Sequence, residues 1–500
     1  KTLNFTSGVS FVKKNLLSSL LILLLLTTLN FAQSTKDTEI PFVNKVLPNG
    51  LEVIVLSDPS VPLVTVELAV RNGSFTEPPE FNGLSHLYEH MFFKPNRAVR
   101  VYWCEQFVKF QRPDLYNARG CSSHMGFKNA IGNVGYLRTI DQLGLANNAT
   151  TREEVVNYYF TTTSPHVATS IRFINDAIRY PTFEQEELDS EKTVVLGEMD
   201  RNEANPFFYL SNALKDKLYY KYPTRKKPLG TRKTVSEATT EMMKTIQSRY
   251  YVPNNSALII TGDVDTAEVF RLAEENFGDW ERRAVDPFKE FPLIEHPALP
   301  KSSGEIVEQP IKNTLIQIGW QGPSIGKDDA ATYAADVFSY ILGQPDSKFQ
   351  RALVDSGLAV AADLNYYTQR NVGPITLTLV TSPENAKKAL AEAYKQLEQF
   401  DKPGYYNDQE LENAKTLLEA RDLFEREKLS EYSHTLAFWW SSTGIDYFRG
   451  YQKNLRAVSS KEINRYIGTY IKAKPHVGVA LISKESQAKV KLAESDLIGK

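Results

Sequence analysis

The sequence predicts an α+β fold built from two similar halves joined by a linker. Strand and helix patterns are mixed in residues 40–284, without the regular alternation that marks a parallel βαβ sheet. Residues 306–500 repeat the order of the first half: strand, helix, long helices and closing strand. Proline-rich residues 285–305 lie between the halves and are interpreted as the linker. We therefore expect two homologous two-layer α/β-sandwich domains, each with a mixed or antiparallel sheet and helices.

The first half begins with a predicted hairpin at residues 43–56, where Pro48-Asn49-Gly50 lies between two β-rich runs. Its other expected elements are strand 64–70, helix 84–91, helix 165–179, helix 184–203, strand 257–261 and a helix from Thr266. In the second half we expect strand 314–320, helix 328–342, strand 375–380, helix 382–400 and a closing strand 477–482.

Composition places the chain among globular proteins and excludes two classes of partner. The 500 residues are 42% hydrophobic and include 25 Pro and 26 Gly, which is ordinary for a protein with two or three cores. The formal net charge of −2 gives no electrostatic footprint for nucleic acid or for an anionic membrane. We therefore expect neither as a partner.

The N-terminus has the pattern of an export signal. Lys13 and Lys14 precede an apolar run at residues 16–26, and a cleavage site near Ala32 follows. The run is too short to span a bilayer comfortably. We interpret residues 1–32 as a signal peptide with an upstream extension. An exported protein is expected, periplasmic or secreted, with no stable membrane span after cleavage; a retained N-terminal anchor is the alternative.

One segment of the first half carries residues suited to metal chemistry. His86 and His90 lie one turn apart on the predicted helix, so both imidazoles share a face with Glu89 beside them. A catalytic zinc ion takes such imidazoles and leaves one position to a water whose pKa falls to roughly 7. Glu89 is placed to accept the proton of that water. The alternative is a solvated face or a core histidine, but His-x-x-Glu-His is a zinc-peptidase signature.

The flanking residues favour a helix at this position. Asn82 is expected to cap its N-terminus. Leu84, Leu87 and Met91 form an apolar stripe that would anchor the helix to the core.

A third protein ligand is required, and the predicted helix 184–203 offers two candidates. Glu191 and Glu198 are seven residues apart, so they lie two turns apart on the same face. From spacing alone, either carboxylate could reach the metal. The alternative for any single glutamate on such an acidic helix is a solvated surface charge.

The motif and several other runs resemble the pitrilysin/insulinase family of zinc peptidases, over most of residues 40–500. The matching runs are Gly73-Ser74, Glu77 and residues 82–94, 147–150, 191–198, 228–231 and 253–264. This resemblance implies that His86, His90 and Glu198 bind one zinc ion per chain. It also implies that Glu89 is the catalytic general base. Glu191 would be a second catalytic acidic residue that supports a ligand histidine or the water.

The resemblance further implies the substrate and the setting of the reaction. Asn148 and Ala149 fall where the edge strand of the family pairs with the substrate backbone, which is β-augmentation. We therefore expect a zinc-dependent endopeptidase that cleaves short or unfolded peptides in an enclosed chamber. Its two homologous domains would form half of a clam-shell, and the second domain, which has no His-x-x-Glu-His, would enclose the substrate.

Two positions depart from the family pattern and predict a partner subunit. In the family, an Arg and a Tyr seven residues apart hold the substrate carbonyls and the oxyanion, whereas Leu353 and Val360 occupy these positions here. Losing an oxyanion donor costs about 10²–10³ in rate. We therefore expect a homologous second subunit that supplies both groups. Two alternatives remain: Arg351 substitutes through a shift in register, or the chain is a weak or inactive structural subunit of an envelope complex.

An insertion at about residues 95–133 also departs from the family pattern, and it lengthens the gap between His90 and Glu198. It contains the only two cysteines of the chain, Cys104 and Cys121. In an exported protein an even pair is expected to form a disulfide rather than a metal site. The insertion could line the mouth of the chamber and sort substrates, or it could be a tolerated surface loop.

Overall fold

The computed structural model describes residues 41–142 and 146–499. The predicted signal peptide therefore lies outside the described residues. No helix in the described ranges is both long enough and apolar enough to cross a membrane. Residues 42–500 form one compact unit that contains two β-sheets.

The first sheet has six strands in the order β1-β2-β6-β3-β5-β4. These strands are β1 (Val43–Val46), β2 (Glu52–Ser57), β6 (Ser256–Gly262), β3 (Leu63–Val70), β5 (Val156–Thr163) and β4 (Ala146–Thr151). Only β2 and β6 pair in parallel, and every other pairing is antiparallel. The predicted hairpin 43–56 is β1 and β2, and predicted strands 64–70 and 257–261 correspond to β3 and β6.

The second sheet repeats the topology of the first with one strand fewer. Its order is β7-β11-β8-β10-β9, formed by β7 (Ser303–Glu308), β11 (Val477–Ile482), β8 (Thr314–Gln321), β10 (Pro374–Thr381) and β9 (Ala361–Tyr366). Its first pair, β7 with β11, is parallel and the rest are antiparallel, as in the series β2-β6-β3-β5-β4. The predicted fold class, two α+β layers of similar design, is confirmed.

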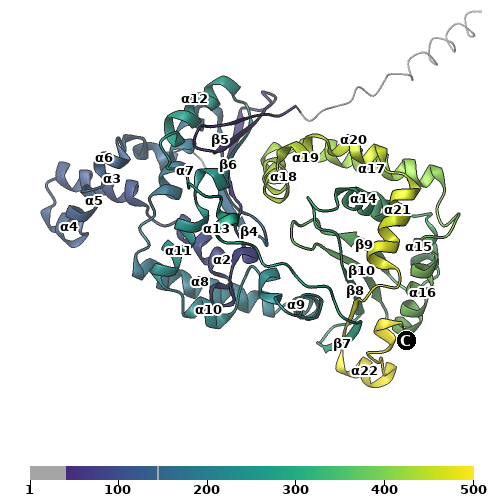
Figure 1. The fold of residues 1–500 in the computed structure, drawn as a ribbon. Coiled ribbons are helices and arrows are strands. Elements are labelled where there is room, and N and C mark those ends of the chain that lie inside the picture. Colours follow the sequence, from purple (N-terminus) through teal and green to yellow (C-terminus); the bar gives the residue numbers. More distant parts are fainter. Residues whose placement is uncertain (1–40, 143–145, 500) are drawn as a thin grey trace, which may run out of the picture. The chain divides into compact units, whose positions relative to one another are not determined.

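Helices cover one face of each sheet and enclose a hydrophobic core (Figure 1). In the first half these are chiefly α2 (Leu84–Phe92), α7 (Val167–Arg179), α8 (Gln185–Glu203), α11 (Thr240–Tyr250) and α12 (Thr266–Phe277). In the second half they are chiefly α14 (Asp329–Gly343), α16 (Ala386–Gln399), α17 (Asp408–Arg426) and α21 (Ser460–Tyr466). Alternate strand residues point into these cores, and β9 and β10 show this as alternating burial along the strand.

The opposite face of each sheet is covered by a helix from the other half. Helix α18 (Leu429–Ser442) packs on β3 and β6 of the first sheet. Its Ser433 and His434 bond Glu67 of β3, on the face opposite that of core residue Leu68. Conversely, α9 (Pro206–Leu218) packs on β8 and β11 of the second sheet through residues such as Leu214. This exchange of helices joins the two halves.

Candidate metal centre

The helix α2 is anchored as the apolar pattern predicts. Leu84, Leu87 and Met91 are buried in the core of the first half. His86 and His90 lie on the opposite, partly exposed side of the helix. The core face therefore fixes the direction in which both imidazoles point.

The predicted cap of this helix is wrong. The residue that caps α2 is Gly83, in the left-handed conformation with φ 89°. A Cβ atom there would lie 2.6 Å from the Cα atom of Gly230, so only glycine fits. The Asn82 amide instead donates hydrogen bonds to backbone carbonyls outside the helix. The buried carboxylate of Glu77 takes the capping role, because it accepts the backbone N–H groups of Gly83 at 2.8 Å and Ser85 at 2.7 Å.

Helix α8 brings a carboxylate between the two imidazoles. The Oε2 atom of Glu198 lies 3.5 Å from Nε2 of His86 and 3.7 Å from Nε2 of His90. One ligand atom from each of these three residues can be chosen so that all lie within 4.8 Å of one another. In the described part of the chain this is the one His/Cys/Asp/Glu group with such geometry.

Glu191 occupies a different position from Glu198. Its Oε2 atom lies 2.9 Å from Nδ1 of His90, on the far side of the imidazole from Glu198. A carboxylate at Nδ1 favours the tautomer that leaves the lone pair of Nε2 free for a metal. Lys94 forms an ion pair with Glu191, which offsets its charge.

The residues present fit a zinc ion. Two imidazoles and one carboxylate are a donor set of catalytic zinc sites, in which a fourth position stays open. Burial, together with the neighbouring His90, lowers the pKa of His86 to about 4, so its imidazole is neutral, the form that binds metals. The buried Nδ1 atom of His86 has no hydrogen-bond partner among the described residues.

Glu89 lies beside this group and is held by a strand. The side chain is 8% exposed. Its Oε2 atom accepts a hydrogen bond of 2.6 Å from the hydroxyl of Thr151, at the end of β4. Burial raises the pKa of Glu89 to about 6, while the bond from Thr151 opposes that rise. Sequence reasoning missed both Thr151 and the capping role of Glu77, although both lie in or next to the runs that carry the family resemblance.

The predicted substrate-binding residues lie on the edge strand of the first sheet. Asn148 and Ala149 are in β4, which pairs with β5 on one side and stands at the end of the strand order. Asn148 is exposed and Ala149 is buried. Since β4 also contacts α2, this edge lies next to the helix that carries both histidines.

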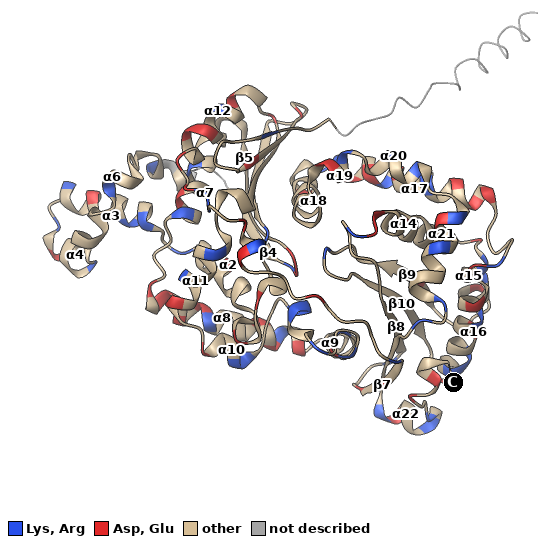
Figure 2. Ribbon diagram, in the orientation of Figure 1, with Lys and Arg blue, Asp and Glu red and all other residues tan. Residues whose placement is uncertain are grey.

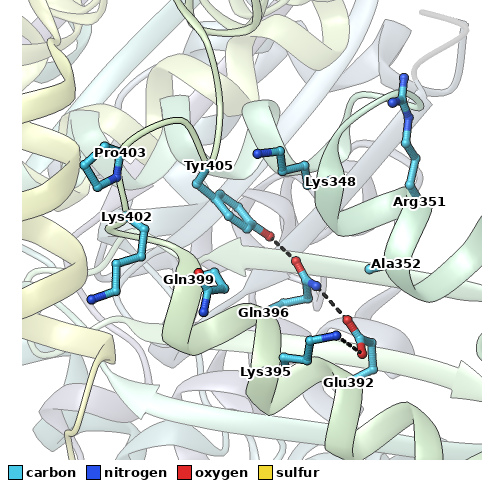
Figure 3. Close-up of a pocket in the computed structure, with 10 residues that line it drawn as sticks. All are labelled: Lys348, Arg351, Ala352, Glu392, Lys395, Gln396, Gln399, Lys402, Pro403 and Tyr405. Atoms are coloured by element: carbon cyan, nitrogen blue, oxygen red, sulfur yellow. Dashed lines mark hydrogen bonds and ion pairs between the residues drawn. The ribbon is translucent and has the colours of Figure 1, made fainter.

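Leu353 and Val360, the positions that depart from the family pattern, lie in the second half of the chain. Leu353 is fully buried in the core of the second half, and Val360 is 68% exposed. Arg351 lines a pocket of about 480 Å³ between the segment at Lys348 and helix α16. In that pocket the Arg351 side chain points away from Tyr405 (Figure 3). Neither Leu353 nor Val360 provides a polar group for an oxyanion.

The insertion is helical and contains a disulfide. It consists of α3 (Arg97–Lys109), α4 (Pro113–Ala118), α5 (Cys121–Met125) and α6 (Lys128–Ile131). Cys104 of α3 and Cys121 of α5 are joined by a disulfide bond. The sequence predicts this disulfide bond but not the helices around it.

Comparison with protein families matches both halves of the chain. A model described as insulinase (peptidase family M16) matches residues 52–99 and 121–232. A model described as the peptidase M16 inactive domain matches residues 237–418. The first match thus includes the segments of His86, His90 and Glu198, and it leaves out residues 100–120.

Relatives and solved structures agree with these matches. An uncharacterized zinc protease of Rickettsia felis is 24% identical over 401 residues, covering 80% of this chain and 87% of that protein. The zinc protease PqqE of Helicobacter pylori is 22% identical over 439 residues, covering 85% and 89%. Among solved structures, a protease from Helicobacter pylori has a TM-score of 0.72 at 20% identity, covering 88% of this chain and 99% of that one. An M16-like peptidase from Alicyclobacillus acidocaldarius has a TM-score of 0.72 at 19% identity, covering 89% and 99%. These comparisons and the repeated fold establish that the chain belongs to the insulinase family of peptidases, family M16.

Proposed function

We propose that this chain is a zinc-dependent endopeptidase. The observation that carries the proposal is the convergence of His86, His90 and Glu198 with Glu89 held beside them. A structural zinc site usually closes with four protein ligands. Three ligands next to a buried carboxylate suit hydrolysis instead.

His86, His90 and Glu198 would hold the zinc ion, which when bound supplies Lewis-acid polarisation of a peptide carbonyl and of a water molecule. Glu89 accepts the proton of the attacking water and then donates it to the leaving amine. The Thr151 hydroxyl keeps the Glu89 carboxylate in place during both transfers.

Two further groups of the chain support this chemistry. Glu191 orients the imidazole of His90 through its Nδ1 atom. The backbone at Asn148 and Ala149 pairs with an extended peptide that adds a strand beside β4. Because a folded protein offers few extended free segments, the substrates are short or unfolded peptides.

The complete enzyme includes a second subunit and acts outside the cytoplasm. Leu353 and Val360 stand where the family has its Arg and Tyr, so a homologous chain lacking zinc ligands would supply these groups and complete the chamber. The export signal predicted for residues 1–32 supports a periplasmic or secreted location. The same two substitutions support one alternative, a catalytically weak or inactive structural subunit.

Zinc content and peptide cleavage test the proposal on the same samples. The purified chain should contain about one zinc ion. Glu89→Gln should keep this ion and Glu198→Gln should bind it more weakly, because of these two glutamates only Glu198 is a ligand. Glu89→Gln should reduce cleavage of an unstructured fluorogenic peptide by about 10²–10⁴-fold. Glu186→Gln is the matched control for Glu198→Gln, because Glu186 is an exposed glutamate on the same helix, α8.

Cleavage should be weak for the chain alone and rise when a related second chain is added. Zinc bound without any cleavage in either condition would favour the structural subunit. Absence of zinc from the wild-type chain, or equal zinc loss in Glu186→Gln, would refute the assigned site.

A further inference from the structure

The insertion carries a part that the family does not share. The match to the insulinase model leaves out residues 100–120, which form most of α3 and all of α4. The disulfide from Cys104 to Cys121 closes this segment near its two ends. Helix α4 has its main contacts with α3 and α5, inside the insertion. The segment is therefore a covalently closed helical projection (Figure 1).

Large apolar side chains are exposed on this projection. Phe110 is 65% exposed, Val108 61% and Trp103 37%. Trp103 and Phe110 are seven residues apart, so they lie on one face along α3 and its end. Phe127, near α6, is 37% exposed as well. Three exposed large apolar side chains thus lie on α3 and its C-terminal end, and such a concentration is typical of a docking surface.

The same segment is basic although the whole chain is not. Residues 97–128 contain six Lys and Arg and two Asp and Glu, a local net charge of +4, against −2 for the chain. Figure 2 shows this excess of blue over red on α3–α6. Arg112 and Lys128 have acidic partners inside the insertion. Arg100 is buried and pairs with Glu184 and Glu187 outside it. Lys109 and Arg119 form no ion pair with the described residues, so their charges are available to a ligand.

We propose that residues 97–128 dock the protein on an anionic phospholipid surface. The Nζ atom of Lys109 lies 5.4 Å from the centroid of the exposed Phe110 ring, so the occupant must accept a cation and an apolar tip side by side. A bilayer interface does so, because hydrocarbon and phosphate lie there at adjacent depths. The near-neutral net charge of the chain excludes attraction by the molecule as a whole, but it does not exclude a local basic patch.

This surface is independent of the peptidase site. The main contacts of α3 and α4 are with one another and with α5, α6 and α7, and not with α2 or α8, which carry the candidate metal ligands. The family match around the site also continues without residues 100–120. Its effect would be to hold the chain at a membrane surface. A protein partner for the same projection is the competing occupant.

Vesicle sedimentation tests the proposal with the full chain. The vesicles are phosphatidylcholine alone and an equimolar mixture of phosphatidylcholine and phosphatidylglycerol. The wild-type chain should bind the anionic vesicles more tightly than the neutral ones, and added salt should weaken that binding. Every variant carries the same N-terminus, so a difference between variants reports the insertion and not the predicted signal peptide.

Two variants of the projection and one matched control complete the experiment. Val108→Ser with Phe110→Ser should weaken binding about tenfold or more, because the apolar insertion is lost. Lys109→Gln with Arg119→Gln should weaken it about fivefold for each charge removed. The control is Leu423→Ser with Phe424→Ser on α17.

The control residues are as exposed as Val108 and Phe110, at 56% and 75%. Helix α17 (408–426) contains three basic and six acidic residues, so its net charge is negative and the control should bind like the wild type. Unchanged zinc content in all variants shows that they fold. Equal binding to both vesicle types, or equal loss in the control, would overturn the proposal. Undiminished vesicle binding in both projection variants would also overturn it, because the lipid contact would then lie outside the projection.

Discussion

Replacing Glu77 with alanine should loosen the start of the helix that carries both histidines. Glu77 is 3% exposed and lies ahead of α2 in the chain. Its carboxylate accepts the backbone N–H groups of Gly83 and Ser85. These groups have no partner inside the helix, since the first N–H groups of a helix never do.

The size of the stability change follows from the two buried backbone N–H groups that lose their acceptor. An unsatisfied buried N–H costs about 1–3 kcal/mol, so losing both acceptors should lower the free energy of unfolding by about 2–4 kcal/mol after partial access of water. Glu77→Gln keeps one acceptor oxygen but turns an NH₂ group toward the other N–H. We expect about half the effect for that variant, roughly 1–2 kcal/mol.

Urea denaturation and hydrogen exchange measure this effect at two levels. Denaturation gives the change in global stability, and exchange of the amides in residues 84–90 reports the first turns of α2. Zinc affinity should fall with the rise in exchange, because His86 lies in this segment. Glu80→Gln is the control, an exposed glutamate three residues away, which should change stability by less than about 0.5 kcal/mol.

Equal behaviour of Glu77→Ala and Glu80→Gln would refute this role of Glu77. A fall in stability with no more exchange in α2 than in the other helices of the first half would refute it as well. In that case Glu77 would contribute to general packing and not to the capping of the metal-binding helix.

Three further predictions concern other parts of the chain. Glu191→Gln should lower zinc affinity about 10–100-fold in a chelator competition, because the carboxylate that orients His90 is lost; an unchanged affinity would contradict that role. Burial raises the pKa of Asp336 to about 7, so the folded chain keeps a proton that the unfolded chain releases above about pH 4. Stability should therefore fall as pH rises from about 4 to about 7 and then level off, and Asp336→Asn should flatten this part of a urea-midpoint profile; an identical slope would refute the assignment. Replacing Cys104 and Cys121 by Ser opens a loop with a separation of 17 residues and should cost about 3 kcal/mol of local stability, seen as faster exchange in the insertion with zinc content unchanged; lost zinc would show that the insertion supports the metal site.

The metal-binding helix could be predicted because its signals are local. The apolar stripe and the spacing of His86 and His90 both follow from 3.6 residues per turn, and they lie within one short segment. The cap could not be read in the same way. Asn82 is the residue type expected before a helix, yet its amide bonds carbonyls of a distant loop, and Glu77 takes its place.

The third metal ligand could not be identified from sequence spacing alone. Glu191 and Glu198 share a helix face, so spacing alone left both as candidates, and only the resemblance favoured Glu198. The packing of α8 against α2 places Glu198 between the two Nε2 atoms and Glu191 at the Nδ1 atom of His90. The strand β4 was missed by pattern for a related reason. Its run from Ala146 to Thr151 is polar and partly exposed, so it lacks the alternation that marks a half-buried strand.

The sequence by itself determined the fold class, the two similar halves and the helix that carries the histidines. Each of these rests on periodicity and short-range spacing, which neighbouring residues encode. The tertiary structure alone decided which surfaces meet. The pattern of Leu210, Leu214 and Leu218 shows that one face of α9 is apolar, but not that this face packs on the sheet of the other half. The same holds for α18, whose Ser433 and His434 reach Glu67 across 366 and 367 residues of chain. The sequence of a helix indicates that one of its faces must pack on a partner. Which segment becomes that partner depends on how distant parts of the chain pack together.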